Sequence, residues 1–252
     1  MKNVKSLLKR LIIGAAIMAA TLCSTSCRFV TIERSKFDNE SISINTDADT
    51  GKKDVIKGSD REVSRDFSSL GEIRELIIDG SADVSVRQSE NPVLSIELPA
   101  NLEDYLRVDY DNGKCNIYLD RSHRYTNASF DIILGTSTLE KLSINGASDI
   151  EMGRVTLGDL SLEINGAGDV DIHHITCGDL SIEINGAGEI DAQNMDCKSI
   201  TAEINGAGEI DLGGKCVDLD VRVSGTGSVD VSRMECTGKK NVHRDGLVTI
   251  KI

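Results

Sequence analysis

One eight-residue pattern recurs through the second half of this chain and constrains its fold more than any other feature. The pattern is Ile-Asn-Gly-Ala, then Ser or Gly, then an acidic, an aliphatic and a second acidic residue. Four copies follow one another at a spacing of 20 residues, and a fifth, degenerate copy follows after 19. A fixed period of this length is the signature of a repeat architecture in which each copy stacks on its neighbour. The copies span residues 144–151, 164–171, 184–191, 204–211 and 223–230.

The repeat alternates apolar and polar residues with a period of two, as β-strands do. Aligned copies place apolar side chains in inward columns that begin at Leu142, Ile144, Ile150 and Val155. An isolated coil cannot bury its own apolar face, so we predict an all-β solenoid with coils of about 20 residues. A row of β-hairpins joined by Asn-Gly turns is the alternative, but identical copies favour parallel stacking in register.

The Asn-Gly-Ala-Gly segment predicts a sharp corner in each coil. Gly reaches positive φ without steric cost, and Asn tolerates the left-handed region better than most residues. The stacked amides are also placed to bond to one another along the coil axis, as Asn ladders do in cross-β stacks. Such a ladder would join Asn145, Asn165, Asn185 and Asn205.

Residues 1–26 have the pattern of a bacterial lipoprotein signal peptide. Four basic residues precede an apolar run at 11–22 that is too short for a stable membrane span. Residues 24–27, Ser-Thr-Ser-Cys, then resemble a lipobox, although Ser24 stands where Leu is commonest. Cleavage without lipidation is the alternative. We predict a lipid anchor on Cys27, a membrane partner through that anchor, and an outer-membrane location in the cell envelope, on either face.

The remaining chain divides into a predicted flexible tether, residues 27–66, and one folded domain, residues 67–252. Residues 36–66 are polar and lack a sustained apolar period, so they cannot bury enough surface to offset the entropy of ordering. Loss of the leader, which holds four basic and no acidic residues, changes the formal net charge from −13 to −17. This charge argues against nucleic acid as a partner and against adhesion to an anionic lipid surface.

Several motifs of the folded part together indicate a family. Leu-Gly-Glu-Ile at 70–73 precedes a coil with the sequence DGSADVSV at 79–86, and a hairpin is predicted around Asn112-Gly113 before the tandem INGAG coils. With these motifs the chain resembles the head GIN domain family of putative autotransporter adhesins. The resemblance covers about residues 67–238. The resemblance implies a right-handed parallel β-helix-like solenoid with a β-hairpin insert, an envelope location and an adhesin-like role.

Four cysteines recur with the coil period. A straight column of side chains about 4.8 Å apart cannot surround one zinc ion. Disulfides between adjacent coils are a second alternative, but Cβ atoms at that spacing lie slightly beyond the usual range of about 3.5 to 4.5 Å. Leu157 holds the same position one coil earlier, so we interpret the cysteines as small apolar core residues. They are Cys177, Cys197, Cys216 and Cys236.

Acidic residues form outward columns on the strand after each corner. Like charges directly opposite across strands are unfavourable, so solvent, salt or a bound cation must offset them. We favour a solvated face that keeps the protein soluble, with no cofactor. The alternative is a calcium-stabilised module, because the Gly-x-Gly-acidic-x-Asp spacing resembles the calcium β-roll despite the shorter period of that motif. Its ligands would be Asp169, Asp171, Glu189, Asp191, Glu209 and Asp211.

No spacing typical of a catalytic triad stands out, and we predict that the chain is not an enzyme. A polysaccharide-active β-helix enzyme is the further alternative, but such sites need long loops and these coils have tight corners. Tyr and Arg anchor interfaces, and here they gather at 105–125, whereas no aromatic residue follows Phe130. Covering the end of the solenoid is another role for these tyrosines. We predict a binding or scaffold protein that uses Arg121, Arg124 and Tyr125 to bind a glycan or an envelope protein.

The leader generates the first testable prediction. Metabolic labelling with a fatty acid is expected to mark the wild-type protein and not Cys27→Ala, because lipidation requires the thiol of that residue. Cys23→Ala is the matched control, and it is expected to keep the label. Persistent labelling of Cys27→Ala would show that another residue carries the lipid.

Overall fold

The computed structural model describes residues 54–252. This part of the chain is all-β, with two short 3-10 helices as its only helical segments. The predicted leader and Cys27 lie outside it. The elements are β1 (Val55–Lys57), β2 (Glu62–Asp66), η1 (Ser68–Leu70), β3 (Glu75–Asp79), β4 (Ser81–Gln88), β5 (Val93–Pro99), η2 (Ala100–Tyr105), β6 (Leu106–Asp111), β7 (Lys114–Leu119), β8 (Arg124–Thr126), β9 (Ser129–Thr136), β10 (Lys141–Thr156), β11 (Leu160–Cys236) and β12 (Lys240–Lys251).

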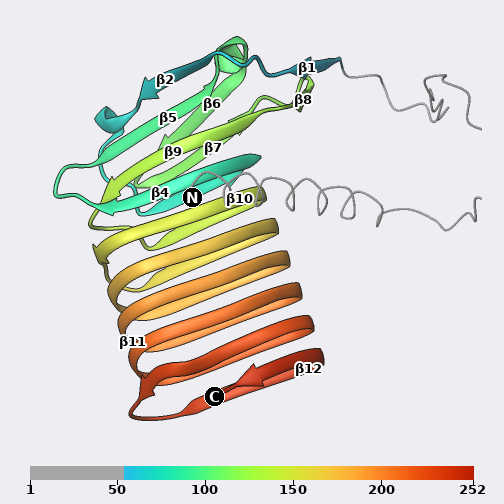
Figure 1. Cartoon of the computed structure of the whole chain (residues 1–252). Coiled ribbons are helices and arrows are strands. Elements are labelled where there is room, and N and C mark those ends of the chain that lie inside the picture. Colours follow the sequence, from blue (N-terminus) through green and yellow to red (C-terminus); the bar gives the residue numbers. More distant parts are fainter. Residues whose placement is uncertain (1–53) are drawn as a thin grey trace, which may run out of the picture.

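The repeat copies pair in parallel and in register. β10 pairs with β11 so that Leu142 lies opposite Leu162 and Ile144 opposite Ile164. β3 and β4 pair in parallel with β10, and β12 pairs in parallel with β11. Figure 1 shows β11 winding through successive turns that lie one above the other. The row of antiparallel hairpins is therefore excluded for these copies.

The inward columns predicted from the alternation form the core. Every member of the four columns is buried, from Leu142 and Ile144 in β10 to Val229 and Met234 at the end of β11. Burial of an aliphatic side chain stabilises a fold by roughly 1.5 to 3 kcal/mol. The columns run from coil to coil, so the core is continuous along the stack.

β10 and β11 run through the predicted Asn-Gly-Ala-Gly corners without interruption, so strand pairing continues through them. The Gly after Asn has a positive φ in the later copies, 149° at Gly166 and 147° at Gly186. Within residues 54–252, positive φ outside Gly is confined to Asn112, Asn127 and Asn194, so no corner Asn adopts it. A residue without a Cβ is favoured at such a position.

The predicted ladder of asparagine amides is confirmed. Nδ2 of Asn165 donates to Oδ1 of Asn145 at 3.1 Å, and the same bond recurs from Asn185 to Asn165 and from Asn205 to Asn185. In the same coil, Nδ2 of Asn165 also donates to Glu163 at 2.9 Å. Glu183 and Glu203 accept the equivalent bonds, so each carboxylate of this acidic column has a hydrogen-bond donor in its own coil.

The stack is extended at its N-terminal end by a smaller set of strands. β2 pairs antiparallel with β5 and β5 antiparallel with β9, while β9 pairs in parallel with β4. β6 and β7 form the hairpin predicted at Asn112-Gly113, where both residues have positive φ. Figure 1 shows these strands above the coils of β10 and β11.

The predicted boundary between tether and domain at residue 67 is too late. β2 lies within the predicted tether yet pairs with β5, and β1 pairs in parallel with β8. Most side chains of β2 are exposed, so β2 is held to β5 mainly by backbone hydrogen bonds. The pattern of apolar residues in the sequence does not reveal such bonds. Over residues 54–252, the chain forms no helix with the length and apolarity to cross a bilayer.

The corner glycines generate the second prediction. A Cβ on Gly186 would lie 1.7 Å from the carbonyl oxygen of Gly166, and the φ of Gly186 disfavours any L side chain. We expect Gly186→Ala to lower the free energy of unfolding by at least about 2 kcal/mol. Gly158→Ala is the matched control, since a Cβ there would meet nothing within 4 Å.

Denaturant unfolding of both variants measures the difference. Gly158→Ala is expected to stay within about 1 kcal/mol of the wild type, because its added methyl group displaces no atom. Equal stability of Gly186→Ala and the wild type would contradict the close approach between coils.

Candidate functional site

An open depression lies beside the hairpin, where the chain leaves β7 and loops toward β8. Its volume is about 680 Å³. Tyr118, Arg121, His123 and Tyr125 line it from the hairpin side, and Asp79 lines it from the end of β3. This is the segment in which the sequence concentrates its aromatic and basic residues. The depression therefore combines apolar ring surface with both signs of charge.

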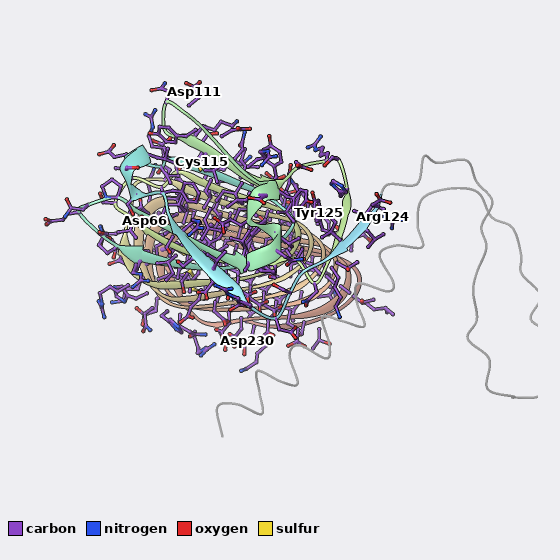
Figure 2. All side chains as sticks on the ribbon, turned by 90° about the horizontal axis from the view of Figure 1, so that it is seen from above. Asp66, Asp111, Cys115, Arg124, Tyr125 and Asp230 are labelled. Carbon is purple, nitrogen blue, oxygen red and sulfur yellow. The ribbon has the colours of Figure 1, made fainter. Side chains whose placement is uncertain are left out.

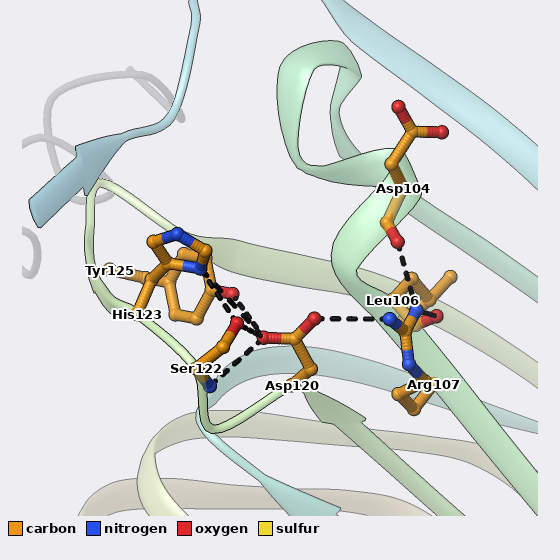
Figure 3. Close-up of polar contacts among 7 residues, drawn as sticks. All are labelled: Asp104, Leu106, Arg107, Asp120, Ser122, His123 and Tyr125. Atoms are coloured by element: carbon orange, nitrogen blue, oxygen red, sulfur yellow. Dashed lines mark hydrogen bonds and ion pairs between the residues drawn. The ribbon is translucent and has the colours of Figure 1, made fainter. Parts of the chain in front are cut away.

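Asp120 organises the loop that forms one wall of the depression. Its carboxylate accepts hydrogen bonds from the Ser122 hydroxyl, from the Ser122 N–H at 3.1 Å and from the Tyr125 hydroxyl at 2.9 Å. Its second oxygen pairs with Arg107 of β6 at 3.0 Å (Figure 3). These hydrogen bonds hold the pKa of Asp120 below its ordinary value, and the bond from the Ser122 hydroxyl has the largest effect. The loop is thus tied to the hairpin through an ionised carboxylate.

Three rings pack beside that carboxylate. The Tyr105 ring meets the His123 ring edge-on, with centroids 5.1 Å apart, and lies 5.7 Å from the Tyr125 ring. Aromatic pairs in this range favour such inclined arrangements. Burial, followed by the hydrogen bond to Asp120, raises the pKa of Tyr125 above its ordinary value. Tyr125 therefore stays a neutral donor across the physiological range.

Asp79 connects the depression to the coils. Its Oδ2 pairs with the guanidinium of Arg121 at 3.3 Å, and its Oδ1 accepts Nδ2 of Asn145 at 2.7 Å. The Arg121 side chain is 82% exposed. Asp79 is therefore the point at which the ladder of amides reaches the site.

A second depression of about 680 Å³ adjoins the first and shares Asp79, Tyr118, Asp120 and Arg121 with it. The Tyr118 hydroxyl donates to Asp109 at 2.9 Å across the hairpin. That hydrogen bond raises the pKa of Tyr118 above its ordinary value. The two depressions form one elongated surface across β7 with Tyr118 and Arg121 at the boundary.

The structure brings together two of the three residues predicted to bind a ligand. Arg121 and Tyr125 line the same depression, whereas Arg124 is exposed on β8 and is not among the lining residues. Figure 2 shows Arg124 at the periphery and Tyr125 closer to the body of the molecule. Asp79 and Asn145 could not be assigned to the site from the sequence, because they are 42 and 24 positions from Arg121 and belong to the repeat.

The acidic residues proposed as calcium ligands in the alternative interpretation lie on successive coils of β11. Several of them contact other residues of the protein. Asp211 pairs with Arg233, Gln193 donates to Asp191, and Asp169 accepts the backbone N–H of Glu189. In the part of the chain that the structure describes, no three His, Cys, Asp or Glu side chains are placed to hold a metal ion.

Fold and site together define an all-β protein whose repeat copies pair in parallel and which carries an open aromatic and charged depression at one end. The chain belongs to the family described as "Putative auto-transporter adhesin, head GIN domain", whose model matches residues 73–243. The resemblance seen in the sequence motifs is thereby confirmed. No curated protein matches this chain.

Solved structures share the fold. A putative adhesin from Bacteroides fragilis is 23% identical, with a TM-score of 0.58, and the match covers 78% of this chain and 99% of that chain. A putative lipid binding protein from Parabacteroides distasonis is 19% identical, with a TM-score of 0.57 and coverage of 78% and 98%. A putative adhesin from Parabacteroides merdae is 15% identical, with a TM-score of 0.53 and coverage of 79% and 98%. At these identities the likeness shows the fold alone.

The carboxylate of Asp120 generates the third prediction. Because its pKa is lowered on folding, its contribution to the order of the loop is present above the ordinary carboxyl pKa of about 3.9 and is lost as the pH falls through the lower folded value. The NMR shift of the Ser122 amide is expected to report this titration.

The matched variants are Asp120→Asn, which should abolish the titration at Ser122, and Asp111→Asn at the hairpin turn, which should leave it unchanged. A midpoint at or above the ordinary carboxyl pKa in the wild type would contradict the role given to Asp120.

Proposed function

We propose that this chain is a non-catalytic, adhesin-like binding protein and that the depression beside the hairpin binds a neutral glycan. The observation that carries the proposal is the grouping of Tyr118, Tyr125, His123 and Arg121 around one open surface of an otherwise acidic chain. Ligand sites commonly combine apolar ring surface with a few polar groups that fix orientation. The remaining coils offer no comparable aromatic surface, since no Tyr, Phe or Trp follows Phe130.

The chemistry of the lining favours a sugar over other ligands. The apolar face of a sugar ring packs against an aromatic ring, and its hydroxyls pair with carboxylates, amides and guanidinium groups. Asp79 and Asn145 supply the acceptors and donors on one side, and Arg121 supplies exposed donors. The carboxylates of Asp79 and Asp120 and the acidic net charge disfavour an anionic glycan. A neutral oligosaccharide fits this surface best.

We further propose that a lipid on Cys27 anchors the protein in the outer membrane of the cell envelope. Support comes from the lipobox-like residues 24–27 and from the description of the family as "Putative auto-transporter adhesin, head GIN domain". The coils are proposed to follow a right-handed parallel β-helix. The parallel, in-register pairs of β10 and β11 support this, because crossovers between parallel strands are right-handed in nearly all proteins.

Substitution of Arg121 and of Arg124, which lie in the same segment, tests the proposed binding site. The protein is applied to an array of immobilised neutral and amino-sugar oligosaccharides, and the best binder is titrated by calorimetry. Arg121→Ala is expected to weaken binding by at least about tenfold, because it removes the exposed donors of the depression. Arg124→Ala is the matched control: it removes the same charge three positions away, outside the lining, and is expected to change affinity by less than about twofold.

Equal loss of affinity in both variants would show that general charge, and not the depression, carries binding. Absence of any bound glycan, with binding to an envelope protein instead, would contradict the ligand class. Release of reducing or unsaturated sugar from the bound oligosaccharide would contradict the non-catalytic role.

A further inference from the structure

Four cysteines on the coils form two sulfur pairs. Sγ of Cys177 lies 2.9 Å from Sγ of Cys197, and Sγ of Cys216 lies 3.2 Å from Sγ of Cys236. Cys197 and Cys216 are 5% exposed, and their partners are half-buried. These side chains lie in or against the core, as predicted, and their sulfur atoms are in addition in contact within each pair.

The surrounding strands hold each pair in a geometry that suits a disulfide. Neighbouring strands lie about 4.7 to 4.9 Å apart, which falls inside the Cα separation of about 4.4 to 6.8 Å found across disulfides. The S–S bond length is about 2.05 Å, so the sulfur atoms need to approach by only about 1 Å. Rotation about χ1 moves the sulfur atoms but not the Cβ atoms, so closure of the bridge also draws the two coils together by about 0.2 to 0.4 Å at this point.

We propose that Cys177–Cys197 and Cys216–Cys236 are two disulfide sites that cross-link neighbouring coils. Each bridge would join one coil to the next through a loop of about 20 residues, long enough for the cross-link to restrict the unfolded chain appreciably. The second bridge would fasten the last complete coil before β12, in the part of a repeat stack that opens most readily.

The oxidation is a thiol–disulfide exchange with a small external disulfide such as oxidised glutathione. The Cys197 thiolate attacks one glutathione sulfur, which forms a mixed disulfide and releases the first glutathione thiolate. The Cys177 thiolate then attacks Sγ of Cys197, which forms the bridge and releases the second glutathione. The two thiol protons pass to the glutathione thiolates, and two electrons reduce the external disulfide.

The shared hydrogen bonds set the order and the pH dependence of these steps. The bond to Cys197, together with burial, raises the pKa of Cys177, whereas the same bond lowers the pKa of Cys197. In the other pair, burial and then the contact with Cys236 raise the pKa of Cys216 to about 12. The thiolate is the reacting form, so we expect the bridges to form faster as the pH rises above neutrality.

Cys115 provides an internal contrast. It is fully buried in β7, burial raises its pKa to about 11, and within residues 54–252 it has no sulfur contact with another cysteine. It is expected to remain a thiol under conditions that oxidise both pairs.

The test uses the purified full chain, incubated under native conditions with oxidised glutathione or with reduced glutathione. Unreacted thiols are alkylated in denaturant, and peptides are mapped by mass spectrometry without reduction. We expect peptides linked through Cys177–Cys197 and Cys216–Cys236, and an alkylated Cys115. The oxidised protein should melt at least about 5 °C above the reduced protein.

Matched variants separate the two sites. Cys197→Ala should remove the first bridge and keep the second, Cys236→Ala should do the reverse, and Cys115→Ala should keep both. A link between Cys197 and Cys216 would overturn the pairing. Recovery of the four coil cysteines as alkylated thiols or as glutathione adducts, in excess oxidised glutathione, would overturn the proposal.

Discussion

Each coil of this protein lies against the previous one through a contact that only glycine permits. A Cβ on Gly166, Gly186 or Gly206 would lie 1.7 to 1.9 Å from the carbonyl oxygen of the corner glycine 20 residues earlier. This close approach sets the height of one coil above another and fixes their register. Because strand side chains alternate between faces, a slip of one residue would move every apolar side chain out of the core. The columns, the ladder and the sulfur pairs all depend on this single backbone contact.

The register survives one irregularity in the repeat. Between the copies at 204–211 and 223–230 the spacing is 19 residues, and the missing residue falls around Gly213-Gly214. Gly214 has a φ of 136°, and a Cβ there would collide with the backbone of Met195. The shortened coil is thus drawn against its neighbour at one point. Gly225 then returns to its place on Gly206, with a Cβ-to-oxygen distance of 1.9 Å.

The coils could be predicted from the sequence because their contacts repeat at a fixed interval. Alternation identified Leu142 and Ile144 as core residues, and the recurring Asn identified the ladder. The corner Gly was identified from its conformational freedom, but the sequence does not reveal that strand pairing continues through the corner. β2 was assigned to the tether, since an exposed strand attached by backbone hydrogen bonds has the composition of a linker.

The candidate site was only half predictable for a related reason. Arg121 and Tyr125 stood out by composition, but Arg124 shares that composition and faces elsewhere. Asp79 occupies the position that Asn holds in the later coils, so in the sequence it resembles an imperfect copy of the repeat. Only the pairing of β3 with β7 brings it near the loop after β7, 42 residues away.

The substitution of Asp for Asn at that position gives the ladder a direction. Every amide donates its N–H toward the preceding coil, from Asn205 through Asn185 and Asn165 to Asn145, and the last donates to the Asp79 carboxylate. The side-chain dipoles therefore add head to tail, with their positive end at a fixed negative charge, as peptide dipoles do along a helix. At the other end Ser224 follows in place of Asn, and the series stops. The two ends of the stack therefore differ electrostatically, although the coils are similar. The positive end of the aligned amide dipoles lies at Asp79, which also forms the ion pair with Arg121.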